Sequence, residues 1–178
     1  MNKHRRNLIG TLATGVVVAG LAMISAGTAA AQTLPDIEAI VRQFHVNYSN
    51  GEVEKNGALV DDSLIVQLNG GADNKVNGFT FKGRDQFVAW IKGEKGVFPD
   101  GKITDNDVVV SGNMAAIRFT FEGTQTGPME TPNGTLPATG RKVVVQGTEF
   151  FTFNSSGKLI HLETLSDDLG LLSQLTAK

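Results

Sequence analysis

The spacing of apolar residues changes about halfway along the chain. In the first half apolar residues recur at steps of three and four, which is the period of one face of an α-helix. From about residue 103 the step shortens to two, the period of a β-strand with one buried face. The predicted helices cover 34–50, 52–60, a stretch from about 84 to 96, and the chain end from about 167. The predicted strands cover 63–68, 79–81, 103–110, 114–125, 142–153 and 159–165.

The first and third predicted helices each have one apolar stripe. In the first helix the stripe comprises Ile37, Ile40, Val41, Phe44 and Tyr48. His45 lies beside this stripe, and we expect it to be a partly exposed helix residue. In the third helix the stripe comprises Phe87, Trp90 and Ile91. Both helices therefore have one side that must pack against another layer.

The connections between the last four strands predict an antiparallel meander. Residues 111–113 and 154–157 are rich in Gly, Asn and Ser and are short enough for hairpin turns. Helices followed by such a meander indicate an α+β domain with helices on one side of a sheet. Asp61 and Asp62 are expected to form a turn before the first strand. Residues 126–140 form a Pro-, Gly- and Thr-rich loop, and long loops of this kind often cover a site.

The last predicted strand carries the main chemical feature of the sequence. Side chains alternate between the two faces of a strand, so His161 and Glu163 share a face, and Asp167 follows in the same alternation. A histidine and two carboxyl groups on one side of a strand end can form a binding or acid/base site. Two other interpretations remain open: Asp167 caps the following helix, and His161 and Glu163 form a surface pair.

The N-terminal segment has the composition of a secretory signal peptide. Residues 3–6 are basic, residues 8–26 are apolar and uncharged, and the run Ala29–Ala31 suits cleavage before Gln32. A retained membrane anchor is the alternative interpretation. We therefore expect a signal peptide over 1–31, one domain over 32–178, and a bacterial protein that is secreted or periplasmic, with no stable membrane anchor if the signal is cleaved.

The composition of the predicted mature chain excludes several classes of function. Residues 1–31 contain three of the sixteen Lys and Arg residues and no acid, which leaves thirteen basic and eighteen acidic side chains, a net charge of −5. Without a basic cluster, binding to nucleic acid is not expected. The chain has no cysteine, so disulfides and thiol catalysis are excluded. Only His45 and His161 remain as histidines, so a His-rich metal site is not expected.

Five motifs, in a fixed order, carry a resemblance to a known family. They are Phe81–Phe87, Val97–Asp100, Gly123–Gly127, Pro137–Arg141 and Gly157–Leu175, and they span nearly the whole predicted mature chain. Together they resemble the SnoaL-like polyketide cyclase (ester cyclase) family of the nuclear transport factor two-like superfamily. The resemblance implies a cone-shaped curved antiparallel sheet with N-terminal helices packed over its concave face, a mostly apolar pocket, and a homodimer in many members.

The resemblance also implies a reaction and a set of site residues. Founding members of the family close a ring by aldol condensation without a metal or cofactor, and an aspartate at the start of the last helix acts as acid/base. That position matches Asp167, with His161 as a second catalytic candidate. The candidates for binding a small apolar or carbonyl-containing substrate are Glu163, Gln125, Gln67 and Trp90.

The sequence departs from the family at several of these positions. Gln125 and Gln67 stand where many members have histidine, and an amide can donate and accept hydrogen bonds but cannot transfer protons. Export also separates the protein from the cytoplasm, where the substrates of such cyclases are made. The alternative functions are therefore a non-catalytic ligand-binding protein and a dimerising interaction domain.

Overall fold

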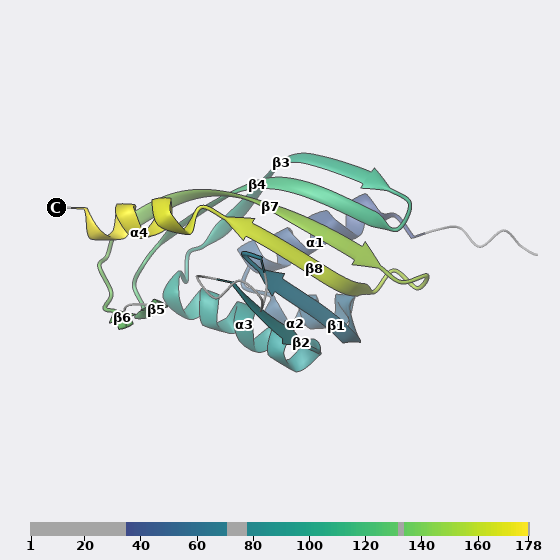
Figure 1. Cartoon of the computed structure of the whole chain (residues 1–178), viewed down its shortest axis with the longest axis horizontal. Coiled ribbons are helices and arrows are strands. Elements are labelled where there is room, and N and C mark those ends of the chain that lie inside the picture. The colour runs from purple at the N-terminus through teal and green to yellow at the C-terminus, as the bar shows by residue number, and fades with distance from the viewer. Residues whose placement is uncertain (1–34, 71–77, 132–133, 178) are drawn as a thin grey trace, which may run out of the picture. The chain divides into compact units, whose positions relative to one another are not determined.

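The computed structural model describes residues 35–70, 78–131 and 134–177 (Figure 1). The predicted signal peptide lies outside these residues. The helices are α1 (Ile37–Ser49), α2 (Val53–Leu59), α3 (Arg84–Val97) and α4 (Asp168–Thr176). The strands are β1 (Val60–Leu68), β2 (Phe79–Lys82), β3 (Lys102–Ser111), β4 (Met114–Thr124), β5 (Met129–Thr131), β6 (Gly134–Leu136), β7 (Lys142–Phe153) and β8 (Leu159–Ser166).

Six of the strands form one curved sheet in the order β2-β1-β8-β7-β4-β3 (Figure 1). The strands β3, β4, β7 and β8 pair antiparallel, as the short connections predicted. The pairing of β1 with β8 is parallel, with Val66 opposite Leu162. The last strand thus lies between the first strand and the meander. This α+β architecture, with helices over a curved sheet, confirms the predicted fold class.

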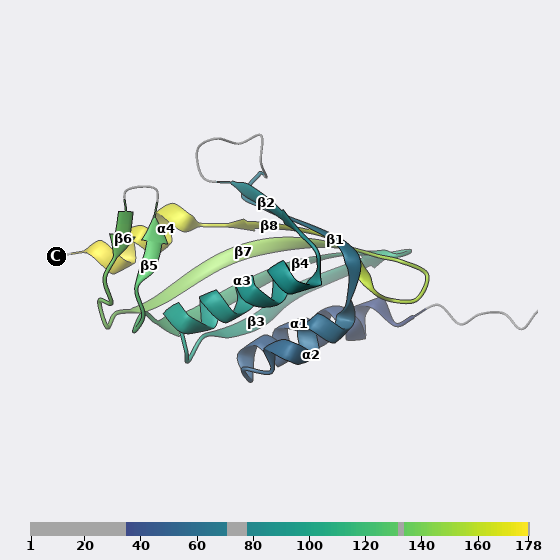
Figure 2. The same ribbon diagram turned by 90° about the horizontal axis from the view of Figure 1, so that it is seen from below.

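The helices α1, α2 and α3 lie on one side of the sheet (Figure 2). Between them and the sheet is the main core, in which α1 contributes Val41 and Phe44. The sheet contributes apolar side chains from alternate positions, namely Leu64, Val66, Ile117, Phe119, Phe151, Phe153 and Leu162. Burial of this apolar surface is the main favourable term in folding, and no disulfide adds to it, because the chain has no cysteine.

Helix α1 begins at a cap that the sequence supplies locally. The side chain of Asp36 accepts a hydrogen bond from the backbone N–H of Ala39 at 3.0 Å, which satisfies one of the unpaired donors of the first turn. Four residues of the predicted stripe, Ile37, Val41, Phe44 and Tyr48, are buried. No described helix is long and apolar enough to cross a membrane.

Two local predictions were wrong. Asp61 and Asp62 lie within β1 and not in a turn, and the pairing of β1 with β8 shifts register between Val60 and Ile65. This irregularity lets the strand carry polar residues near its start. The stretch 126–140 contains the two-stranded hairpin β5–β6, which pairs Met129 with Leu136.

Helix α4 packs against the start of β7. The side-chain amide of Gln174 accepts a hydrogen bond from the backbone N–H of Val144 and donates one to its carbonyl, both at 2.9 Å. Leu175 is buried with Phe98, Val143 and Val145 in a second apolar cluster. The amide thus pairs with the backbone as a neighbouring strand would.

Candidate active site

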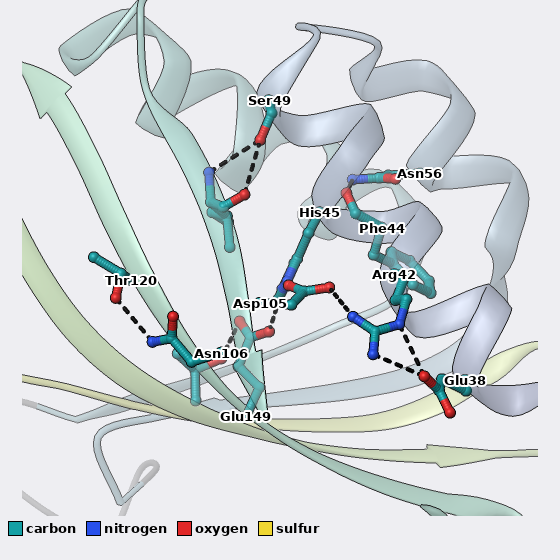
Figure 3. Close-up of polar contacts among 12 residues, drawn as sticks. Glu38, Arg42, Phe44, His45, Ser49, Asn56, Asp105, Asn106, Thr120 and Glu149 are labelled. Atoms are coloured by element: carbon teal, nitrogen blue, oxygen red, sulfur yellow. Dashed lines mark hydrogen bonds and ion pairs between the residues drawn. The ribbon is translucent and has the colours of Figure 1, made fainter. Parts of the chain in front are cut away.

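A histidine is buried between two carboxyl groups inside the main core. His45 extends from α1 toward the sheet and is 5% exposed (Figure 3). Its Nδ1 atom lies 2.5 Å from Asp105 Oδ1, and its Nε2 atom lies 2.8 Å from Glu149 Oε2. Asp105 is on β3 and Glu149 is on β7, so the imidazole bridges two strands that are separated by β4. We call His45, Asp105 and Glu149 the buried triad.

The register of the sheet places both carboxyl groups on the helix-covered face. Asp105 pairs with Phe119, and Phe119 pairs with Gly147. Glu149 is two residues after Gly147 and therefore points to the same side. Gly147 leaves room for the aromatic ring, because a Cβ there would lie 2.5 Å from Phe119 Cζ. The His45 ring completes this arrangement at 5.7 Å from the ring of Phe119.

The two carboxyl groups hold the histidine in its charged form. Burial alone lowers the pKa of His45, but the hydrogen bonds and charges of Asp105 and Glu149 outweigh burial and raise this pKa to about 9. At neutral pH His45 is an imidazolium that donates from both ring nitrogens. The other oxygen of Glu149, Oε1, accepts a hydrogen bond from Thr164 Oγ1 at 3.2 Å.

A chain of charged contacts connects the buried triad to the surface. The second oxygen of Asp105 lies 3.4 Å from Arg42 Nη1, and Arg42 Nη2 lies 2.7 Å from Glu38 Oε1 (Figure 3). About half of each of the Arg42 and Glu38 side chains is exposed. The charged side chains therefore run from the half-exposed Glu38 and Arg42 to the buried His45 and Glu149.

The arrangement is suited to proton transfer. A carboxylate that is hydrogen-bonded to an imidazolium can accept a proton from a ligand and return it. Aromatic side chains surround the histidine, with the ring of Phe151 at 6.3 Å, and a low-polarity environment strengthens such electrostatic interactions. Within the described residues no group of three or more His, Cys, Asp or Glu is arranged to hold a metal ion.

Three of the predicted site residues lie together on the face of the sheet opposite α1. His161 Nε2 is 2.8 Å from Gln67 Oε1, and Glu163 pairs in register with Gln67. Glu163 also pairs with Phe150, which is 42% exposed. The structure therefore brings His161, Gln67 and Glu163 together, but on the other side of the sheet from the buried triad.

The other three predicted site residues occupy separate places. Asp167 is exposed and caps α4, where its Oδ1 accepts from the backbone N–H of Gly170 at 2.8 Å. Trp90 lies on α3, with its ring 5.6 Å from that of Phe81. The structure does not bring Asp167 or Trp90 into contact with His161. The roles assigned to them from the sequence stay predictions.

Gln125 is fully buried, and the hydrogen bonds of its side chain hold the surrounding loop together. Its Nε2 atom donates to the carbonyls of Gly127 and Pro137, and its Oε1 atom accepts from the backbone N–H and the hydroxyl of Thr139. These four bonds use the whole capacity of the amide. Gln125 therefore fastens the two ends of the 126–140 segment to each other.

The expected exposure of His45 was wrong, and the signal that would have revealed its burial is in the sequence. His45 follows Val41 by four residues and precedes Tyr48 by three, so it lies within the apolar stripe. Glu149 likewise belongs to an alternation of buried positions in β7 that runs from Val143 to Phe153. His45 and Glu149 are ionisable residues at positions where the pattern of each element requires an apolar side chain. Two such residues on neighbouring elements indicate a pair that is buried together.

A family comparison decides the classification of the chain. The model of the SnoaL-like domain matches residues 41–162. The chain belongs to the SnoaL-like domain family. The matched range includes all three members of the buried triad and ends before Asp167. No curated protein sequence matches this SnoaL-like chain.

Solved structures show the same fold. A protein from Jannaschia sp. CCS1 that is assigned as a SnoaL-like polyketide cyclase has a TM-score of 0.68 and 17% identity, over 80% of this chain and 92% of that one. IdmH from Streptomyces antibioticus, assigned as a polyketide cyclase, has a TM-score of 0.64 and 22% identity, over 79% and 99%. TsrD from Streptomyces laurentii has a TM-score of 0.65 and 25% identity, over 80% and 96%.

Proposed function

We propose that this SnoaL-like protein is an acid/base enzyme that acts on a small carbonyl-containing molecule, with Glu149 as the group that accepts and returns the proton. The observation that carries the proposal is the hydrogen bonding of Glu149. Its two oxygens accept from His45 and Thr164 on the helix-covered face of the sheet, and Glu149 as a whole residue is 7% exposed. His45 positions Glu149, and Asp105 positions His45.

The proposed reaction is an aldol-type ring closure. Glu149 removes a proton from the carbon next to a carbonyl group, and the electrons of the C–H bond move into an enolate. The enolate carbon then attacks a second carbonyl carbon of the same molecule, which forms the new C–C bond. The proton returns from Glu149 to the oxygen of that second carbonyl. The hydrogen bond from His45 Nε2 to Glu149 Oε2 holds the carboxyl group in place for this step.

Exchange of hydrogen for deuterium at the α-carbon of 2-tetralone tests the first step of this reaction. The exchange is followed by proton NMR in D₂O, with the protein and with buffer alone. We expect the wild-type protein to accelerate exchange and the Glu149→Gln variant to lose about 10²-fold or more of that acceleration, the usual contribution of a general base. Asp167→Asn, which changes the exposed helix cap, is expected to retain it.

The same experiment separates the alternatives. Loss of exchange in Asp167→Asn, with Glu149→Gln unchanged, would assign the base to Asp167 as the family resemblance implies. No acceleration by the wild-type protein would favour the non-catalytic ligand-binding function. Circular dichroism and the urea midpoint of each variant verify folding, and Glu149→Asp, which retains a carboxyl group, is expected to recover part of the activity.

A homodimer is supported by the face of the sheet opposite α1, which we call the uncovered face because α1, α2 and α3 of the described chain all lie on the other side (Figure 2). Register places Val109, Phe150 and Leu165 on this face with His161 and Glu163, and Val109 is 66% exposed. A twofold interface brings the same patch of two copies together, so opposite charges on one patch can pair across it. We expect the protein to have the mass of a dimer in light scattering and Phe150→Glu to shift it to a monomer. A monomeric wild-type protein would contradict this.

Export remains part of the proposal. The support is the composition of residues 1–31, with a basic start, an apolar run and an Ala-rich end. The intact mass of the protein isolated from the periplasm or the medium tests it, because cleavage before Gln32 removes a known set of residues. A protein of full-length mass in the membrane fraction would favour the anchor instead.

A further inference from the structure

The last residues of the edge strand β3 are open to solvent. This strand is ten residues long and is the outermost strand at its end of the six-stranded sheet (Figure 1). Within it, Val109 is 66% exposed and Val110 is 40% exposed. Natural proteins often protect such an edge with lysine or proline, but residues 103–111 contain neither. The end of β3 therefore presents an apolar strand to which another strand can be added.

Contacts with α1 occupy the beginning of this edge. The Ser49 hydroxyl accepts a hydrogen bond from the backbone N–H of Ile103 at 3.0 Å and lies 3.5 Å from the carbonyl oxygen of Ile103. It thus takes the place of a neighbouring strand. Further along, Arg42 contacts Asp105, and the pairing with β4 shifts register between Asp105 and Asp107. Regular edge backbone is therefore available only from Asp107 onward.

The turn between β3 and β4 determines which backbone groups face outward. Ser111 pairs with Met114, so only Gly112 and Asn113 lie in the turn. Gly112 has a φ of +59°, which suits the first central position of a type II′ hairpin turn. The residues that close such a turn form a hydrogen-bonded pair, and these pairs recur at every second position along the strands. The backbone of Ser111 is therefore bonded to β4.

Alternation from Ser111 leaves two outward positions in the open end of β3. Val109 is also bonded to β4, because it is two residues earlier, whereas the N–H and C=O groups of Val108 and Val110 point away from β4. Within the described residues these outward groups have no hydrogen-bond partner in the protein. Four unpaired backbone groups thus lie beside the exposed side chains of Val109 and Val110.

We propose that the β3 strands of two copies of this chain pair antiparallel about a twofold axis at Val109. Val108 of each copy then lies opposite Val110 of the other copy, and their N–H and C=O groups form four backbone hydrogen bonds. The two Val109 side chains meet on the uncovered face, where β-branched side chains pack well against cross-strand neighbours. The sheets of the two copies become one continuous sheet.

Charge and register favour this axis over its neighbours. With the axis at Val109, Asp107 lies opposite Ser111, whose hydroxyl can donate to the carboxylate, and no two carboxylates meet. An axis at Val108 places Asp107 opposite the apolar Val109 and brings the irregular part of β3 into the pairing. An axis at Val110 places Val108 opposite the turn. Only the axis at Val109 pairs regular strand residues with each other.

The edge contact is separate from the homodimer on the uncovered face and does not depend on the proposed reaction. The twofold axis of an antiparallel strand pair is perpendicular to the sheet, so the surface with Phe150 and Leu165 stays accessible. Homodimers built on that surface present two edges each, and edge pairing links them into tetramers or chains. The edge contact is well below the standard interface size, so we expect a Kd of about 0.1–1 mM for one edge pair.

Sedimentation equilibrium of the Phe150→Glu variant isolates the edge contact, because this variant lacks the apolar centre of the other surface. We expect mostly monomer at about 10 µM and a dimer fraction that grows up to about 1 mM, as this Kd requires. A second substitution, Val110→Pro, removes an outward N–H at an edge position that tolerates proline, and it should abolish the dimer. The matched control Val110→Thr keeps the N–H and the β-branched shape and should retain the dimer.

Amide exchange measured by NMR tests the same contact without a change in β3. In the Phe150→Glu variant, exchange at Val108 and Val110 should slow by about two- to threefold between about 0.05 mM and about 1 mM, as the free fraction falls. The amide of Val109 is bonded to β4 in a single copy and should not change.

Three results would overturn the proposal. The first is equal exchange at Val108 and Val110 at all concentrations. The second is protection of both amides already at the lowest concentration, which would show that the edge is covered within one copy. The third is a mass that rises with concentration equally in Val110→Pro and Val110→Thr, with circular dichroism showing that both variants are folded.

Discussion

Replacement of His45 by leucine is expected to lower the free energy of unfolding by about 3–5 kcal/mol. The substitution puts an apolar side chain of similar size in place of the imidazolium, so it removes the cation between Asp105 and Glu149. Each of these carboxyl groups loses its hydrogen bond to the imidazole and must either remain charged in a buried site or take up a proton. Urea unfolding followed by circular dichroism measures the change.

Two further variants decide whether the effect arises from the charges. His161→Leu removes the other histidine, which bonds to Gln67 on the uncovered face, and should cost less than about 1 kcal/mol. Replacement of all three members of the buried triad by leucine removes the unpaired charges, and we expect most of the stability to return. If the triple variant is as unstable as His45→Leu, loss of packing and not charge explains the result.

The stability of the protein is expected to fall by about 3 kcal/mol between about pH 6.5 and pH 9. The folded state raises the pKa of His45 from 6.5 to about 9, so this residue binds its proton more tightly in the folded than in the unfolded chain. Its contribution is fully present below pH 6.5 and is lost as the pH rises through 9. Urea unfolding at a series of pH values measures this fall.

Glu94 gives a decrease of the same sign at lower pH. Burial, and then the charge of Asp168, raise its pKa from 4.5 to about 7 in the folded state, so its contribution is lost between these values. The interval above pH 7 therefore isolates His45. His45→Leu should show a nearly flat stability there, whereas Glu94→Gln should keep the wild-type fall. A wild-type protein with constant stability from pH 7 to pH 9 would contradict the assignment of a charged His45.

Local rules were sufficient for most of the fold. The three- and four-residue spacing located α1 and α3, and the two-residue spacing with short turns located β3, β4, β7 and β8, because these features depend on neighbours in sequence. The parallel pairing of β1 with β8 could not be predicted in this way. This pairing places Ile65 opposite His161, which is far away in the sequence. Neither strand contains a signal that specifies its distant partner.

The candidate site was harder to predict, because it depends on which face of each strand turns toward the helices. Alternation correctly placed His161 and Glu163 on one face and Leu162 and Thr164 on the other. Alternation also puts Glu149 on the buried face of β7, but it does not show that Asp105 and His45 meet Glu149 there. The pairing of β3 with β4 shifts register between Asp105 and Asp107, so the alternation of side chains in β3 breaks directly after Asp105. Without knowledge of this shift, the sequence does not indicate that Asp105 points inward.

The position of β8 in the sheet determines when, during synthesis, the chain can complete its fold. The β1–β2 pair is attached to the meander only through β8, which ends at Ser166. During synthesis, β1 and β2 therefore lack their sheet partner until β8 is available. Contacts between such distant segments slow folding, because the intervening chain must first be ordered. The nascent chain should thus remain incompletely folded, and accessible to chaperones, until β8 has been synthesised.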